Sequence, residues 1–176
     1  SLLYRLEGRR LLAYERAMAT LARRSYFVTP NETALFLSQA PECQGRVQSM
    51  GNGVDADFFV PNPLRLNPFE AGEQAVVFTG AMDYWPNIDG VSWFAADVLP
   101  LLRTRWPLAR FYIVGRSPSS QVQALAGAHV VVTGTVPDVR PYLQYASAVV
   151  APVRVARGVQ NKILEAMAMQ QPVVTG

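Results

Sequence analysis

The feature that most constrains this fold is a regular alternation of short apolar runs and helix-like stretches in the second part of the chain. The runs are continuously apolar, which is typical of parallel strands buried on both faces. Stretches with helical periodicity separate them. The runs are Ala75–Thr79, Phe111–Val114, Val130–Thr133, Ala148–Pro152 and Pro172–Thr175. This alternation predicts an α/β fold with a doubly wound, parallel, Rossmann-like sheet and right-handed crossovers.

Four predicted helices connect these strands, and Pro100 should kink the last turn of the first one. They are Ile88–Arg103, Ser119–Ala126, Pro137–Ala146 and Gly158–Met169. In the usual strand order, 3-2-1-4-5, a ligand binds beyond the carboxyl ends of the strands, at the switch point between strands one and four. The loop that begins at Gly80 and the loop that contains Arg154 should therefore lie side by side.

The last predicted helix and the loop before it have the chemistry of an anion site. Arg154 and Arg157 precede Gly158, and Lys162 lies in the first turns of the helix. The first-turn N–H groups have no partner inside a helix and carry partial positive charge. Together with two guanidiniums and one ammonium, they favour a phosphate or a diphosphate. Glu165 would instead accept hydrogen bonds from a ribose diol.

Lys162 and Glu165 are three residues apart and should share one face of this helix. Its opposite, core-facing stripe is predicted to be Ile163, Leu164, Met167 and Ala168. The alternative is an ordinary exposed ion pair worth roughly 0.3 kcal/mol. Lys162 is the only lysine among 16 basic residues, which favours the functional interpretation.

The first 72 residues have a different organisation. Residues 1–24 read as one helix, or two joined near Gly8, with an arginine stripe (Arg5, Arg9, Arg16, Arg23) beside apolar residues. Such a stripe is either a solvated face or a surface for an anionic membrane. Thr29 to Glu32 has the pattern of a helix start, with a Thr cap, Pro and Glu. Residues 54–72, rich in proline and asparagine, are the predicted linker.

Composition excludes several classes of protein. One cysteine and one histidine exclude an internal disulfide framework and a Cys- or His-rich metal site. A net charge of +3 does not indicate a nucleic-acid partner. No apolar run approaches the ~18 residues that span a membrane, and no secretory signal opens the chain. We expect a cytoplasmic protein, peripheral to the inner membrane if residues 1–24 bind it, and a fragment of a longer chain.

Three motifs carry a resemblance to a known family. GVQNKILEAMAMQQPVV, from Gly158, resembles the donor-binding helix of glycosyltransferase family 4 (group 1), retaining enzymes whose two Rossmann-like domains face a cleft (GT-B). The stretch Gly51–Asp55, with Phe59, is similar to the family's crossing into its second domain. FTGAMDYWPNIDG, from Phe78, is similar to an exopolysaccharide- and exosortase-associated subgroup. The resemblance implies an acceptor-domain tail (1–53), a linker (54–72) and a truncated nucleotide-sugar donor domain (73–176).

The resemblance also implies roles for single residues. Glu165 matches the glutamate that binds the donor ribose, and the nucleotide base would rest on the backbone at Gly134–Val136. The donor-binding positions that it implies are Gly80, Thr135, Val136, Gly158, Val159 and Glu165. The family often has a glutamate where this chain has Arg157, and a basic pair in the loop that here holds Asp83. We therefore expect the diphosphate to be stabilised by Arg154, Arg157 and Lys162, with Arg116 from the loop after strand two.

The activity that the resemblance implies is transfer of a sugar from a nucleotide diphosphate to a hydroxyl of a glycan or lipid-linked acceptor. Fixed cations and N–H groups can stabilise the departing diphosphate, so we expect neither a metal ion nor another cofactor. The sequence leaves two alternative functions open. One is a nucleotide-sugar epimerase on the same fold, and the other is a non-enzymatic domain that binds nucleotides or membranes.

Overall fold

The computed structural model describes residues 2–154 and 158–175, and the chain divides into two units, residues 1–52 and 53–176. The first unit contains helices α1 (Leu2–Leu21) and α2 (Pro30–Gln39), a 3-10 turn (Pro41–Cys43) and a short parallel pair of strands, β1 (Ser25–Phe27) and β2 (Val47–Ser49). α1 is a single helix that continues through Gly8.

The start of α2 confirms the predicted cap. The Thr29 hydroxyl accepts a hydrogen bond from the Glu32 backbone N–H at 3.1 Å and donates to the Glu32 carboxylate at 3.0 Å. The first contact satisfies one of the backbone N–H groups that a helix start leaves unpaired, and the second joins the two side chains. α1 packs onto the small core that lies around Phe36 and Cys43. Arg16 of the predicted basic stripe forms an ion pair with Glu42 at 2.6 Å.

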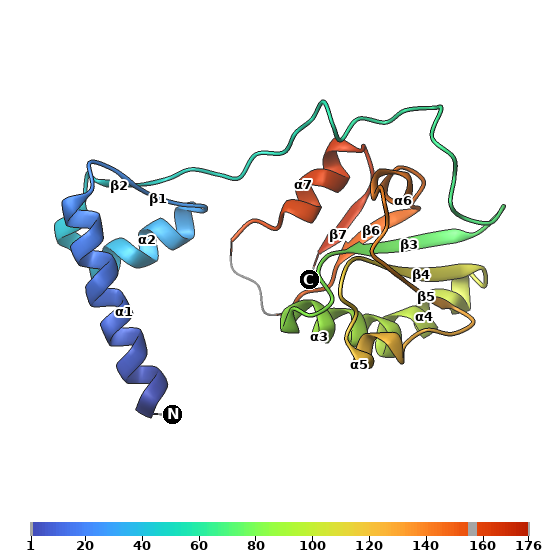
Figure 1. The fold of residues 1–176 in the computed structure, drawn as a ribbon, viewed down its shortest axis with the longest axis horizontal. Helices are drawn as coiled ribbons and strands as arrows, with labels where there is room; N and C mark the ends of the chain where they lie inside the picture. Colours follow the sequence, from blue (N-terminus) through green and yellow to red (C-terminus); the bar gives the residue numbers. More distant parts are fainter. Residues whose placement is uncertain (1, 155–157, 176) are drawn as a thin grey trace. The chain divides into compact units, whose positions relative to one another are not determined.

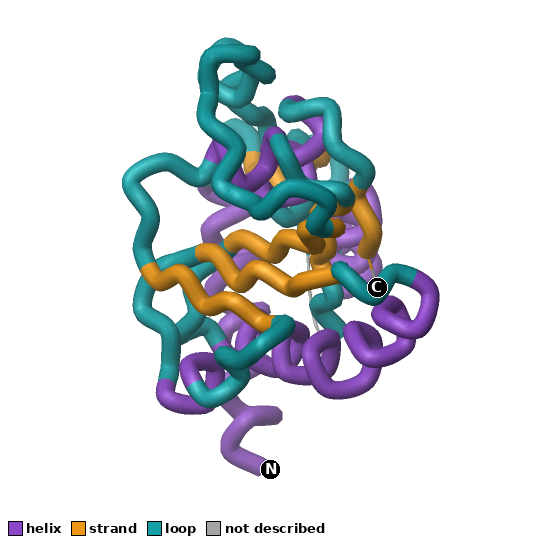
Figure 2. The backbone as a smooth tube through the Cα atoms, turned by 90° about the vertical axis from the view of Figure 1, so that its right-hand side faces the viewer, coloured by secondary structure: helices purple, strands orange, loops and turns teal. Residues whose placement is uncertain are grey.

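The second unit is built on one five-stranded parallel sheet. Its strands are β3 (Gln74–Thr79), β4 (Ala109–Val114), β5 (Val130–Gly134), β6 (Ala148–Ala151) and β7 (Val173–Thr175). They lie side by side in the order β5-β4-β3-β6-β7. Figure 2 draws the strands in orange. Counted within this unit, that order is 3-2-1-4-5, so the predicted topology is confirmed. The switch point lies between β3 and β6.

Helices cover both faces of this sheet (Figure 1). One face packs on α3 (Trp85–Trp93), α4 (Leu99–Arg105) and α5 (Ser120–Gln123). The other packs on α6 (Arg140–Gln144) and α7 (Asn161–Ala168). Successive strand residues enter opposite cores: Val76 and Phe78 enter the first, Ala75 and Val77 the second. Burial on both faces explains why the strands are apolar without alternation.

The helix after β3 is continuous but irregular. Between α3 and α4 the chain makes a π-helical turn over Phe94–Val98. Pro100 has no N–H to donate to the carbonyl of Ala96, and its ring would clash with that carbonyl. The irregularity therefore lies in the turn before the proline, whereas the sequence analysis placed it in the last turn.

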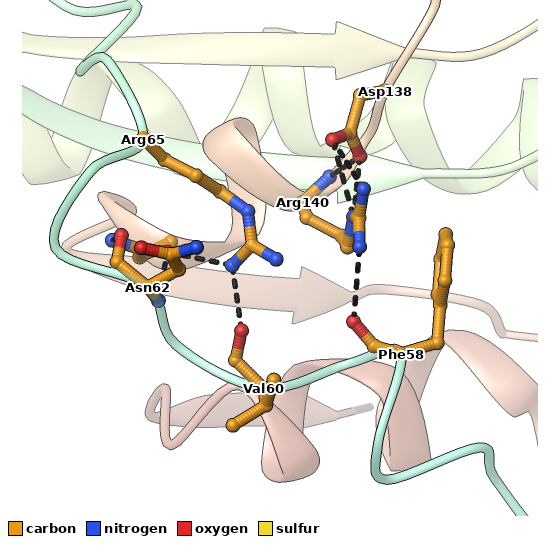
Figure 3. A network of polar contacts seen from close by, with 7 residues as sticks. Phe58, Val60, Asn62, Arg65, Asp138 and Arg140 are labelled. Atoms are coloured by element: carbon orange, nitrogen blue, oxygen red, sulfur yellow. Dashed lines mark hydrogen bonds and ion pairs between the residues drawn. The ribbon is translucent and has the colours of Figure 1, made fainter.

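The predicted linker is part of the second unit and is hydrogen-bonded to α6. We call residues 53–72 the lead segment. The Gln144 side chain of α6 accepts from the Asn62 N–H at 3.0 Å and donates to the Asn62 carbonyl at 2.8 Å. Arg65 donates to the Val60 carbonyl at 2.6 Å and to Gln144 at 2.9 Å (Figure 3). The lead segment thus belongs to the same compact unit as the sheet.

Of the helices in the described ranges, none combines the length and the apolar character that crossing a membrane requires.

Candidate functional site

α7 begins later than its sequence pattern predicts. Its first residue is Asn161 and its cap is Gln160, so Gly158 and Val159 lie in the approach to the helix. Gly158 has a φ of +74°, a left-handed conformation that costs glycine little. Arg157, predicted to contact the diphosphate, lies outside the described residues. The predicted helix start at Gly158 was wrong by three residues.

The face of α7 that meets the sheet also differs from the prediction. Ala166 and Met169 are fully buried, whereas Met167 is 61% exposed. The inward stripe is therefore Lys162, Glu165, Ala166 and Met169, which follow the i, i+3, i+4, i+7 spacing of one helix face. Sequence spacing predicted Lys162 and Glu165 on the face opposite the core. They lie instead at its margin, partly buried.

Lys162 reaches the carboxyl end of β3. Its Nζ donates to Oδ1 of Asn87 at 3.0 Å and stands 3.9 Å from the ring centroid of Phe78. A Cβ added to Gly80 would lie 3.2 Å from that Nζ. The first turn of α7 therefore meets the Gly80 loop at the switch point. Burial lowers the pKa of Lys162 to about 8, and the charge of Glu165 opposes this shift.

Glu165 lies one turn further along the same face. Its burial raises the pKa of the carboxyl group, while the nearby Lys162 lowers it. Across the described residues, the Glu165 carboxylate accepts no hydrogen bond and is in no ion pair. A half-buried carboxylate in this position can accept hydrogen bonds from hydroxyl groups of a ligand.

Asn87 is a site residue that the sequence analysis missed. It lies in the first turn of α3, is 7% exposed, and donates from Nδ2 to the Ala81 carbonyl at 2.9 Å. Its amide thereby joins the Gly80 loop to Lys162. The available signal was an asparagine in an otherwise apolar first turn after strand one. That signal is weak, because asparagine near a helix start is common.

Arg154 has a carboxylate partner. Its guanidinium binds Asp89 of α3 in a bidentate pair, at 2.6 and 3.0 Å. This contact lowers the pKa of Asp89. The arginine is exposed, so the pair is solvated. The charge predicted for Arg154 is thus present beside the switch point, next to a negative partner.

The loops after β3 and β4 are in close contact. A Cβ added to Gly115 would lie only 1.7 Å from the Gly80 carbonyl oxygen, so only glycine permits this approach. The Met82 N–H donates to the Arg116 carbonyl at 2.9 Å, which places the exposed Arg116 at the same edge of the sheet. The loop after β5 carries exposed Thr135 and half-buried Val136, which packs on the second core.

In the described part of the chain, no three histidine, cysteine, aspartate or glutamate side chains come together as a metal site would require. The site therefore consists of an ammonium, a nearby carboxylate, an amide and backbone at the ends of β3 and β4.

A family model identifies the relatives of this chain. The model described as Glycosyl transferases group 1 matches residues 73–176, more than half of the sequence. The chain belongs to the glycosyl transferases group 1 family. The matched range contains the complete sheet and every described site residue. No curated protein matches the chain significantly in sequence.

Solved structures share the fold. WaaG, titled a glycosyltransferase involved in lipopolysaccharide biosynthesis, superposes with a TM-score of 0.72 at 19% identity, over 99% of this chain and 51% of its own. HepE from Anabaena, in complex with UDP and glucose, superposes with a TM-score of 0.67 at 17% identity, over 93% of this chain and 47% of its own. Sucrose-phosphate synthase from Thermosynechococcus elongatus superposes with a TM-score of 0.68 at 21% identity, over 93% of this chain and 43% of its own. The chain has the fold of GT-B domains and spans about half the length of these structures.

Proposed function

We propose that residues 73–176 form the nucleotide-sugar donor domain of a glycosyltransferase, and that residues 1–53 belong to its acceptor domain. The parent enzyme would transfer a sugar from a nucleotide diphosphate to an acceptor hydroxyl on a glycan or lipid-linked substrate. The observation that carries the proposal is the meeting of Lys162 with the Gly80 loop at the switch point. Family membership favours glycosyl transfer over the epimerase alternative.

The proposed donor site assigns one role to each group. Lys162, with Arg154, Arg157 and Arg116, stabilises the diphosphate as negative charge develops on it, without a metal ion. Glu165 accepts hydrogen bonds from the ribose. Gly158 and Val159 offer backbone to the phosphates, and Thr135 and Val136 offer backbone to the base. The UDP complex of the neighbour HepE is consistent with a nucleotide ligand for this fold.

Further features of the proposal come from the resemblance alone. They are a retaining mechanism, membership of family 4 and a role in bacterial polysaccharide biosynthesis, close to the exopolysaccharide subgroup. The Phe78–Gly90 motif supports the last of these. A cytoplasmic location fits a nucleotide-activated donor.

Calorimetric titration of the chain with UDP, GDP and ADP, each with and without Mg²⁺, tests the donor site. We expect one nucleotide to bind without metal. Lys162→Ala should weaken the affinity for this nucleotide about tenfold, because a charged hydrogen bond is lost. Arg9→Ala, a loss of positive charge in the first unit, is the control and should bind as the parent chain does. Absence of binding by all three nucleotides, or equal binding by Lys162→Ala, would contradict the proposal.

We also propose, as a separate function of the first unit, peripheral contact between residues 1–24 and an anionic membrane surface. Leu3, Tyr4 and Leu21 of α1 are 75–78% exposed, so the helix presents apolar side chains to solvent as well as arginines. Arg16, paired with Glu42, would contribute less than the other arginines. Co-sedimentation with phosphatidylglycerol vesicles, compared with phosphatidylcholine vesicles, tests the contact. Equal sedimentation with both, or with neither, would contradict it.

A further inference from the structure

The Lys162 ammonium is held in place by an element far from it in sequence. It extends from α7 toward β3 and donates to Asn87 of α3, 75 residues away. Asn87 makes a second contact, from Nδ2 to the Ala81 carbonyl at 2.9 Å. An ammonium can only donate and a carbonyl can only accept, so these two partners fix the orientation of the amide.

The burial of Asn87 needs an explanation. Asn87 is a polar residue of which only 7% is exposed. Burying an amide is unfavourable unless hydrogen bonds compensate it, and the contact with Ala81 satisfies only its N–H side. The oxygen side is compensated by Lys162. Gly80 completes the cluster, because a Cβ there would lie 2.9 Å from Asn87 Nδ2 and 3.2 Å from Lys162 Nζ.

We propose that Asn87 is a positioning residue that holds the Lys162 ammonium against the Gly80 loop at the carboxyl end of β3. The amide keeps the long, flexible lysine in one orientation, so that its charge faces the anion that enters the switch point. Asn87 acts through Lys162 and the loop. That the anion is a nucleoside diphosphate rests on the proposed function, whereas the hold on Lys162 does not.

The groups around the ammonium determine how removal of Asn87 would act. Phe78 presents its ring from β3, Asn87 its amide oxygen from α3, and Glu165 its carboxylate from α7. Within the described ranges, Glu165 is the charged group that acts on Lys162. Loss of the amide oxygen would remove a hydrogen bond to the charged form. Lys162 would then lose its proton at lower pH.

The composition of the chain makes a direct measurement available. Because Lys162 is the only lysine, protein grown with lysine ¹³C-labelled at Cε gives one ε-CH₂ signal that needs no assignment. Its NMR titration should have a midpoint near pH 8 in the parent chain. We expect a lower midpoint in Asn87→Ala, a higher one in Asn87→Asp, and no change in the exposed control Asn31→Ala. An unchanged midpoint in both Asn87 variants would overturn the proposal.

A double-mutant cycle with Lys162→Met separates positioning of the lysine from support of the loop. Asn87→Ala should weaken binding of the nucleotide selected by calorimetry about three- to tenfold when Lys162 is present, and clearly less in Lys162→Met, where only the contact with Ala81 is lost. Equal weakening in both backgrounds would mean that Asn87 acts only through Ala81, and the proposal would be wrong. If no nucleotide binds, the proposed function fails, and the NMR titration still decides the role of Asn87.

Discussion

At the residue scale, the character of the site comes from two charged groups placed where the protein partly excludes water. Lys162 and Glu165 lie on the inward face of α7. Burial lowers the pKa of Lys162 and raises that of Glu165, so it favours the neutral form of both groups. Partial desolvation is unfavourable for the folded chain, but it strengthens any interaction with a ligand of opposite charge. Perturbed groups of this kind cluster at functional sites more often than elsewhere.

The lowered pKa of Lys162 should make binding of a nucleoside diphosphate at the proposed site depend on pH. Near pH 7 the amine is charged. Above about pH 8 the free protein loses this proton, and binding must recover it. We expect nucleoside-diphosphate affinity to fall on the order of tenfold between pH 7.5 and 9.5. Lys162→Arg, which stays charged, should bind with little pH dependence in the same calorimetric series. A flat profile for the parent chain would contradict this role.

The same shift affects stability with a defined sign. Below about pH 8 the amine is protonated in both folded and unfolded chains, and the folded state bears the cost of its burial. Between about pH 8 and the usual lysine pKa of 10.5, the unfolded chain binds more protons than the folded chain. The contribution of Lys162 to the free energy of unfolding therefore rises with pH over this window.

Glu165 should act on the ribose. Glu165→Gln keeps the shape of the side chain but loses its charge, so nucleotide affinity should fall about 10- to 100-fold, as for other hydrogen bonds to charged groups. A 2′,3′-dideoxy nucleotide should bind both proteins equally weakly, since it lacks the diol. If Glu165→Gln weakened the dideoxy nucleotide as strongly as the normal one, Glu165 would not contact the ribose.

At the element scale, the sheet and its connections place these residues. Strand order was predictable because continuous apolar runs and short connections leave few arrangements for a parallel sheet. The meeting of Gly80 with Lys162 followed from that order. The inward face of α7 was not predictable, because Ile163, Leu164 and Met167 are also apolar and periodicity alone cannot choose between overlapping stripes.

The hydrogen bonds of Asn87 and Gln144 could not be predicted from the sequence, for a different reason. Asn87 and Gln144 act on partners about 75 and 80 residues away, and sequence spacing carries no signal for such pairs. The docking of the lead segment was likewise missed, because its prolines and asparagines have no period. Their contacts form only after the sheet has brought distant segments of the chain together.

Gln144 should be important for the stability of the second unit. It makes hydrogen bonds to both backbone groups of Asn62 and accepts from Arg65. Gln144→Ala leaves these groups without their partner and should lower the free energy of unfolding by about 1–3 kcal/mol in urea denaturation. Gln121→Ala, at an exposed position of α5, is the matched control and should change it by less than about 0.5 kcal/mol. Equal effects would mean that the lead segment is not held by Gln144.

The contact between the ends of β3 and β4 gives a second prediction at this scale. Gly115→Ala would place a methyl group 1.7 Å from the Gly80 carbonyl oxygen, so backbone must move. We expect a loss of about 3 kcal/mol or more in the free energy of unfolding. Gly127→Ala, with no heavy atom within 4 Å of the added carbon, should be tolerated. Similar thermal midpoints for the two variants would contradict this packing.

At the scale of the whole molecule, the chain consists of two units. The second unit contains the five-stranded sheet, the lead segment and the described residues of the proposed donor site, and the family model matches within it. The first unit has its own small core and a capped helix. The two units divide between Asn52 and Gly53, within the turn Gly51–Gly53.

The most direct test of the central claim is a crystal structure of the chain with the nucleoside diphosphate that calorimetry selects. We predict the diphosphate at the switch point, between the Gly80 loop and the start of α7, within hydrogen-bond distance of Lys162. The ribose should contact Glu165. A nucleotide bound elsewhere, such as in the small pocket near Glu73, Arg110 and His129 at the opposite edge of the sheet, would contradict the account.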